Sequence, residues 1–110
     1  GDMIGHTGVY SAVTKAIECI DKLVEKVVTV AVEHDYAVLI TADHGNADFE
    51  VNPDGTPNTA HSLNPVQFIV VNAGDEVKEV KDGALCNVAP TILKIMGIPQ
   101  PEKMTAEPLI

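Results

Sequence analysis

The stretch AVLITADHGN, residues 37–46, decides the fold class of this chain. It opens with a short continuous apolar run, 37–41, which is typical of a strand buried on both faces. Before it, residues 7–34 repeat apolar side chains at spacings of three and four, which predicts a long amphipathic helix. A helix that leads directly into a buried strand is half of a βαβ unit. We therefore expect an α/β fold with a mainly parallel sheet and flanking helices.

The polar end of the same stretch carries the first candidate site. Asp43 and His44 come just past the predicted strand, where open α/β sheets place their ligands. Neighbours on a continuing strand would point to opposite faces, so these two side chains converge only if the chain turns. Gly45 permits such a turn.

The chain after this point predicts three further elements. Residues 42–65 are rich in turn residues, and 66–71 form a second apolar strand. Residues 76–80 alternate polar and apolar side chains and predict a short exposed strand or hairpin arm. Asn87 is expected to cap a last helix, 88–96, which Gly97 and Pro99 would end.

Composition narrows the class of protein and its partners. With 110 residues and 45% hydrophobic residues, the chain suits one small packed domain without a second one. Its net charge of −9 argues against nucleic acid or an anionic membrane as a partner. No apolar run approaches the roughly 20 residues that cross a bilayer. All seven basic residues are Lys, so bidentate Arg clamps for a phosphorylated substrate would have to come from elsewhere.

The two cysteines, Cys19 and Cys86, belong to no short-range motif. We expect both to be small buried apolar residues in a reducing, cytoplasmic setting.

Candidate metal ligands lie in three separate segments. Asp2 and His6 are four residues apart, a spacing that brings both side chains to one point in a helical turn or a tight loop. His61 precedes the second predicted strand. Together with Asp43 and His44, these carboxylates and imidazoles form a plausible set for Zn²⁺ or Mn²⁺. Each pair alone also fits a surface hydrogen bond or a helix cap.

The remaining histidine and two nearby acids have simpler interpretations. His34 is interpreted as a cation at the end of the long helix, and Asp48 and Glu50 as parts of a solvated loop.

Several motifs resemble the cofactor-independent phosphoglycerate mutases. They are GDMIGHTG at 1–8, ITADHGNAD at 40–48, TAHSLNP at 59–65 and NVAPTIL at 87–93. The likeness runs from the first residue to the last, and the order and spacing of the motifs are highly specific. Gln67 replaces a common Pro and Ser62 a common Thr, and neither touches a presumed ligand.

The resemblance implies a partial alkaline-phosphatase-like domain with two metal ions, commonly Mn²⁺, beside a nucleophilic Ser. Zn²⁺ or Mg²⁺ is also possible. By motif, Asp2, His6 and His61 would hold one ion, and Asp43 and His44 would help to hold the other. The family interconverts 2-phosphoglycerate and 3-phosphoglycerate in glycolysis through a phosphoserine, a reaction that suits a two-metal clamp.

The resemblance also implies what this chain does not supply. The nucleophilic Ser, a further Asp ligand and the substrate-binding arginines have no counterpart here, and the only serines, Ser11 and Ser62, lie outside the nucleophile's motif. We therefore expect residues 1–110 to be the C-terminal part of a metal-dependent phosphatase-type domain, inactive alone. Removing neighbouring strands would leave open sheet edges, so we also expect a homodimer.

Two other readings stay open. One is another alkaline-phosphatase-like enzyme, a phosphomutase or phosphodiesterase. The other is a non-catalytic metal-binding module whose acidic surface recruits a protein partner.

Overall fold

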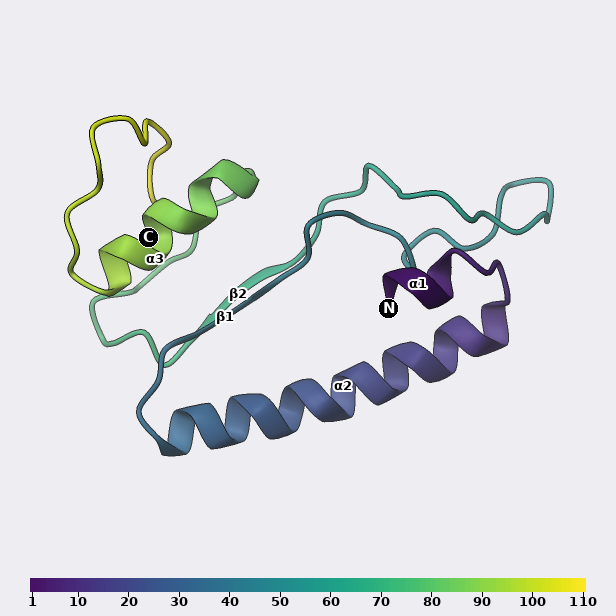
Figure 1. The fold of residues 1–110 in the computed structure, drawn as a ribbon, viewed down its shortest axis with the longest axis horizontal. Coiled ribbons are helices and arrows are strands. Elements are labelled where there is room, and N and C mark those ends of the chain that lie inside the picture. The colour runs from purple at the N-terminus through teal and green to yellow at the C-terminus, as the bar shows by residue number, and fades with distance from the viewer.

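The computed structural model describes all residues, 1–110, as a mixed helix and strand fold (Figure 1). Its elements in chain order are α1 (Asp2–Gly5), α2 (Tyr10–Glu33), β1 (Val38–Thr41), β2 (Phe68–Val71), a 3₁₀ helix η1 (Leu85–Asn87) and α3 (Val88–Ile95). Helix α2 runs along the whole length of the two strands, while α3 and the C-terminal tail form a separate lobe at one end (Figure 1).

Helix α2 confirms the long amphipathic helix, with slightly shorter bounds than predicted. It begins at Tyr10 because Gly8 adopts a left-handed conformation (φ 64°) and Val9 is extended. It ends at Glu33, followed by Asp35 with φ 61°, and the Tyr36 amide donates a hydrogen bond to the Ala31 carbonyl at 2.9 Å. His34 occupies the C-cap position.

The two strands form an antiparallel pair. Val38 faces Val71 and Thr41 faces Phe68 across the ladder. The prediction of parallel pairing is wrong for these strands. Parallel neighbours need a crossover connection, usually a helix, whereas the connection 42–67 contains none and simply folds back beside β1.

The predicted strand at 76–80 is also absent, and this segment is irregular. A strand needs a hydrogen-bonded neighbour, and here the nearest backbone bonds are a turn, Val77 to Gly74, and one bond from the Lys81 amide to the Leu109 carbonyl.

The C-terminal lobe is held by a buried hydroxyl. Thr91 on α3 is completely buried, donates to the Asn87 carbonyl at 2.7 Å and accepts from the Leu109 amide at 2.9 Å. Asn87 does precede α3 as predicted, but its side chain does not cap that helix. It accepts from the Ala84 amide and donates to the Glu107 carbonyl instead. Gly97 follows the helix with φ 66°.

The chain covers little of its own surface. Only 8 of 110 residues are buried, and the accessible area is 8033 Å². A compact protein of 11.7 kDa would expose about 5,900 Å². The radius of gyration is 16.7 Å, compared with about 13 Å for a compact chain of this length. The apolar side chains of the helices and strands are therefore less covered than in a compact protein of this size.

Both cysteines are exposed, so the prediction that they are buried is wrong. Cys19 is exposed because α2 has more apolar surface than the two strands can cover.

Neither α2 nor any other helix is apolar enough over a sufficient length to cross a membrane.

Candidate metal centre

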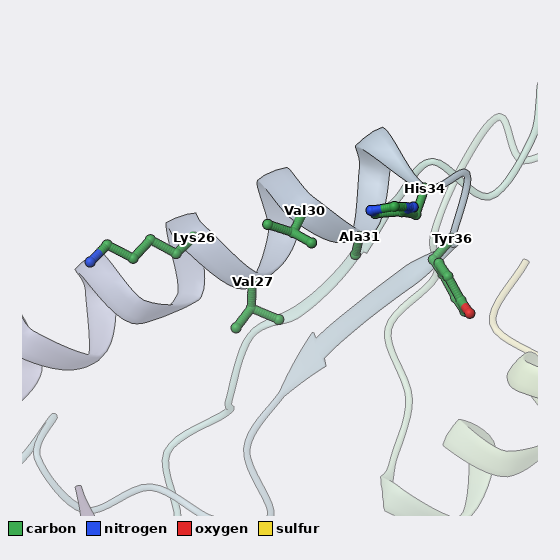
Figure 2. A pocket seen from close by; sticks show the side chains of 6 residues that line it. All are labelled: Lys26, Val27, Val30, Ala31, His34 and Tyr36. Carbon is green, nitrogen blue, oxygen red and sulfur yellow. The ribbon is translucent and has the colours of Figure 1, made fainter.

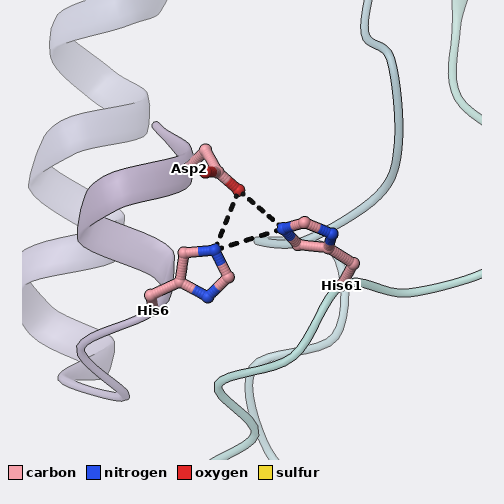
Figure 3. A group of neighbouring side chains, drawn as sticks. All are labelled: Asp2, His6 and His61. Carbon is pink, nitrogen blue, oxygen red and sulfur yellow. Dashed lines mark hydrogen bonds and ion pairs between the residues drawn. The ribbon is translucent and has the colours of Figure 1, made fainter.

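Asp2, His6 and His61 converge at the N-terminal end of the molecule (Figure 3). One carboxylate oxygen, Asp2 Oδ1, lies 3.3 Å from His6 Nε2 and 3.2 Å from His61 Nε2. The two imidazole Nε2 atoms are 3.1 Å apart. Three donor atoms from two distant segments thus point toward one another at the surface.

Helix α1 is a single turn that sets the first two of these side chains. Asp2 begins this helix and His6 is its C-cap residue with helical backbone angles, so the two side chains, four residues apart, lie on the same side. Its Gly5 is buried directly against the connection, because a Cβ there would lie 1.5 Å from Asn46 Oδ1. The absent side chain lets α1 approach the loop that follows β1.

Backbone carbonyls orient two of the imidazoles. The Nδ1–H of His6 donates to the Thr59 carbonyl at 2.7 Å, and the Nδ1–H of His44 faces the Gly45 carbonyl at 3.3 Å. A carbonyl can only accept, so in the neutral form of each ring the proton lies on Nδ1 and the lone pair on Nε2. This arrangement is the usual outer support of a metal-binding histidine.

The separations of the three donor atoms fit one cation. Ligand atoms bound about 2.0–2.2 Å from a single ion at ordinary coordination angles lie about 2.9–3.5 Å from one another. The observed 3.1–3.3 Å falls inside this range. One carboxylate with two imidazoles and no thiol suits Zn²⁺, Mn²⁺ or a similar ion and leaves positions for water or a substrate.

Asp43 and His44 lie beside this cluster rather than within it. His44 Nε2 is 3.6 Å from Asp43 Oδ2 and 3.9 Å from Asp2 Oδ1. The His44 ring stacks on His61 with centroids 3.6 Å apart and an interplanar angle of 19°. The chain does turn here, so these neighbouring side chains converge at one edge of the cluster.

Gly45 allows the chain to turn and also allows Ser62 and Asp48 to pack closely against its backbone. Its carbonyl accepts from the Ser62 amide at 2.8 Å, which joins the two loops that carry His44 and His61. A Cβ at Gly45 would lie 2.1 Å from Ser62 Oγ and 2.7 Å from Asp48 Oδ1. Only glycine leaves room for this junction.

Asp48 has a larger role than a solvated loop residue. Its Oδ2 accepts hydrogen bonds from Ser62 Oγ at 2.8 Å and from Asn64 Nδ2 at 2.5 Å. Because these bonds stabilise the carboxylate, with Asn64 the larger contributor and Ser62 next, they hold the pKa of Asp48 below 3.8.

The interpretation of Glu50 as solvated is wrong. Glu50 is buried, and neither carboxylate oxygen has a partner among residues 1–110. The Glu50 carbonyl accepts a hydrogen bond from the Asn58 backbone amide at 2.8 Å, so Glu50 and Asn58 close the turn 51–57 between them. Asn46 is buried without side-chain partners in the same way.

Sequence reasoning did not identify Gly5, Asn46, Asp48 or the Thr59 carbonyl as parts of this region. Asp48 carried a usable signal, since an acid four residues after His44 in a turn-rich stretch can accept bonds from Ser62 and Asn64. The Thr59 carbonyl carried none, because any residue type presents a carbonyl.

A cavity of about 900 Å³ opens next to Asp43 and His44. It passes Ser62 and Asn64 and reaches Lys81 and Leu109 of the C-terminal lobe. The candidate ligands Asp43 and His44 thus lie beside open space wide enough for a small molecule or for another polypeptide segment.

Comparison with known proteins gives the family. A model of the "Metalloenzyme superfamily" matches residues 1–100. Proteins named 2,3-bisphosphoglycerate-independent phosphoglycerate mutase are 56% identical in Parabacteroides distasonis, 54% in Bacteroides thetaiotaomicron and 53% in Flavobacterium psychrophilum. Each match covers 100% of this chain and 21–22% of the relative, so the chain spans about a fifth of the length of the curated relatives it matches. The convergent carboxylate and imidazoles and the matched family model agree: the chain belongs to the Metalloenzyme superfamily.

Proposed function

We propose that Asp2, His6 and His61 bind one divalent metal ion, and that Asp43 and His44 provide part of a second site. The observation that carries this proposal is the mutual separation of 3.1–3.3 Å between the three donor atoms. Mn²⁺ is the ion we favour, because the motifs resemble a family that commonly uses it and because the donors are oxygen and nitrogen without sulfur. Zn²⁺ and Mg²⁺ are the alternatives.

The reaction we propose for the parent protein is the interconversion of 2-phosphoglycerate and 3-phosphoglycerate. The relatives that carry that activity in their name share about half of this sequence over its whole length. When bound, such ions neutralise the phosphoryl oxygens and lower the pKa of a hydroxyl nucleophile. The residues of this chain hold the ions in place, and Asp43 and His44 face the cavity from which a substrate would approach.

Residues 1–110 then form one part of a phosphatase-type domain, and the chain alone is inactive. Its serines support this view. Ser62 Oγ is committed to Asp48, and Ser11 lies on α2. The parent sheet would continue beyond β1 and β2, whose outer edges are unpaired here, with further strands that can run parallel. Glycolysis in the cytoplasm is the setting we propose, and the two unpaired exposed cysteines fit a reducing compartment.

We further propose that the isolated chain forms a homodimer through α2. Cys19, Leu23, Val27 and Val30 follow one another at spacings of four, four and three, and all are exposed. Figure 2 shows the end of this stripe, where Val27, Val30 and Tyr36 border an apolar groove of about 670 Å³. The groove contains no cluster of metal ligands, so apolar cover, not catalysis, is its expected role.

A chimeric enzyme tests the reaction. The Parabacteroides distasonis mutase would receive this chain in place of its own matching segment, and turnover of 3-phosphoglycerate would be measured with Mn²⁺. We expect mutase activity that is lost in His61→Ala and kept in His34→Ala, since His34 lies at the far end of α2. A folded chimera without activity would contradict the proposed reaction.

Calorimetry with Mn²⁺ and Zn²⁺ on the 110-residue chain tests the metal centre by itself. We expect one ion to bind, and we expect His61→Ala to lower the affinity for that ion at least about tenfold. His34→Ala is the matched control and should bind as the unmodified chain does. Equal affinity in all three proteins would refute the ligand assignment.

A further inference from the structure

The loop after β1 and the loop before β2 are joined through one exposed carboxylate. Asp48 Oδ2 accepts from Ser62, 14 residues away, and from Asn64, 16 residues away. The Asn64 amide in turn donates to Ser62 Oγ at 3.3 Å. Together with the Gly45–Ser62 backbone bond, these contacts form a clasp that consists of Gly45, Asp48, Ser62 and Asn64.

The clasp lies next to the candidate ligands without including any of them. His44 adjoins Gly45 and His61 adjoins Ser62. The stacking of the His44 and His61 rings at 3.6 Å therefore depends on how the two loops are held together. So does the position of His61 Nε2, 3.2 Å from Asp2 Oδ1, because no hydrogen bond to the backbone fixes the His61 ring.

We propose that Asp48 is a positioning residue of the metal centre, which holds the His61 loop in the place where His61 meets Asp2 and His6. The inference rests on the proposed metal binding and adds a residue that touches no donor atom. A carboxylate is suited to this task because both donors, a hydroxyl and an amide, converge on one of its oxygens.

Asp54 provides a matched comparison within the same connection. It is also exposed, and its Oδ1 accepts from the Thr56 amide at 3.0 Å and the Thr56 hydroxyl at 2.6 Å. These bonds span only two residues and stay within one turn. The two acids thus have similar hydrogen bonding, but only Asp48 ties distant loops.

The test measures Co²⁺ and Zn²⁺ binding by the 110-residue chain and its Asp48→Asn and Asp54→Asn variants. We expect Asp48→Asn to weaken binding about tenfold, as loss of outer support does at other metal sites. It should also alter the visible spectrum of bound Co²⁺, which follows the number and geometry of the ligands. Asp54→Asn should change neither quantity.

A double-mutant cycle separates positioning from general stability. Asn64→Ala should weaken binding severalfold in the unmodified chain but add nothing once Asp48→Asn is present, since the two residues act through one contact. If Asp48→Asn does not fold, Asn64→Ala and Ser62→Ala carry the test.

The possible outcomes distinguish this inference from the proposed function. A chain that binds no Co²⁺ or Zn²⁺ would overturn the metal centre itself. Binding by the chain together with unchanged affinity and spectrum in Asp48→Asn would leave the metal centre intact and overturn the role of Asp48. Equal losses in Asp48→Asn and Asp54→Asn would overturn it as well.

Discussion

Two regions of the molecule differ in how well their own residues provide the contacts they need. They are the loops around the histidines and the layer formed by α2 and the strands. In the loops, hydrogen bonds join residues that lie far apart in the sequence, such as His6 with Thr59 and Asp48 with Asn64. In the helix and strand layer, no residue of β1 or β2 is buried, and Val13 is the only buried residue of α2.

This difference follows from the two kinds of interaction. A hydrogen bond is satisfied by one partner at about 3 Å, so a short segment can complete a polar cluster. Apolar burial is proportional to area and needs a whole opposing surface. A chain that spans a fifth of the length of its relatives can therefore bring the candidate ligands together while it leaves a helix face open.

The largest expected effect comes from Gly5→Ala, which attacks the loop region. The new Cβ would overlap Asn46 Oδ1, whose side chain is short and buried. Overpacking of this kind typically costs about 1–3 kcal/mol, and here it would push α1, with Asp2 and His6, away from His61. We expect metal affinity to fall by up to about a hundredfold, measured by calorimetry.

Cys19→Ala on the exposed side of α2 is the control for Gly5→Ala and should leave metal affinity unchanged. Tight metal binding by Gly5→Ala would mean that α1 can move aside without disturbing the ligands. The contacts within the loop region would then not be what fixes the positions of the candidate ligands.

The sequence predicted which candidate ligands lie close together better than it predicted how the strands pair. Spacing and residue type brought Asp2 near His6, and Gly45 signalled the turn that lets Asp43 and His44 converge. These are local properties, so a single sequence contains them. The support from Asn46 and the Thr59 carbonyl is not local, because it depends on how α1 packs against a loop about forty or more residues away.

The fold was predicted at the level of helix and strand but not of pairing. The periodicity of α2 and the apolar runs of β1 and β2 gave the elements to within a few residues. The direction of pairing failed because the rule that links helix and strand to a parallel sheet says nothing about which strands are adjacent. Cys19 was misplaced for a related reason, since periodicity finds an apolar face but not whether something covers it.

A smaller effect is expected from Val27→Glu, which tests the open helix face. A charge in the centre of the stripe should weaken self-association about tenfold or more, because the apolar side chain and its burial are lost. Thr29→Glu adds the same charge on the far side of α2 and is the control. Light scattering over a dilution series measures the change, and a monomer at every concentration would contradict the proposed dimer.

Thiol reactivity gives a milder test of the same face, with a built-in reference. Cys19 lies on the stripe, and Cys86 lies in η1 of the C-terminal lobe. Both are exposed and should react with a thiol reagent without denaturant. As the concentration rises, Cys19 should react severalfold more slowly while Cys86 keeps its rate, because association covers only α2. Parallel slowing of both thiols would place the interface elsewhere.

The smallest expected effect is the acid response of the clasp in the absence of metal. The pKa of Asp48 is lowered by its bonds from Asn64 and Ser62, so the folded state binds the Asp48 proton less readily than the unfolded state does. The stability that this group contributes is therefore complete above its ordinary pKa of 3.8, and it is lost as the pH falls through the lower folded-state value. An Asn at position 48 does not titrate. The melting temperature of Asp48→Asn should then lie below that of the unmodified chain at neutral pH, and the two should approach each other only below about pH 4.

Asp54→Asn is the control. Its melting temperature should depend on pH in the same way, because bonds from Thr56 lower the pKa of Asp54 too, yet it should not affect metal binding. A gap between the Asp48→Asn and unmodified chains that stays constant down to pH 2 would show that the clasp does not depend on the charge of Asp48.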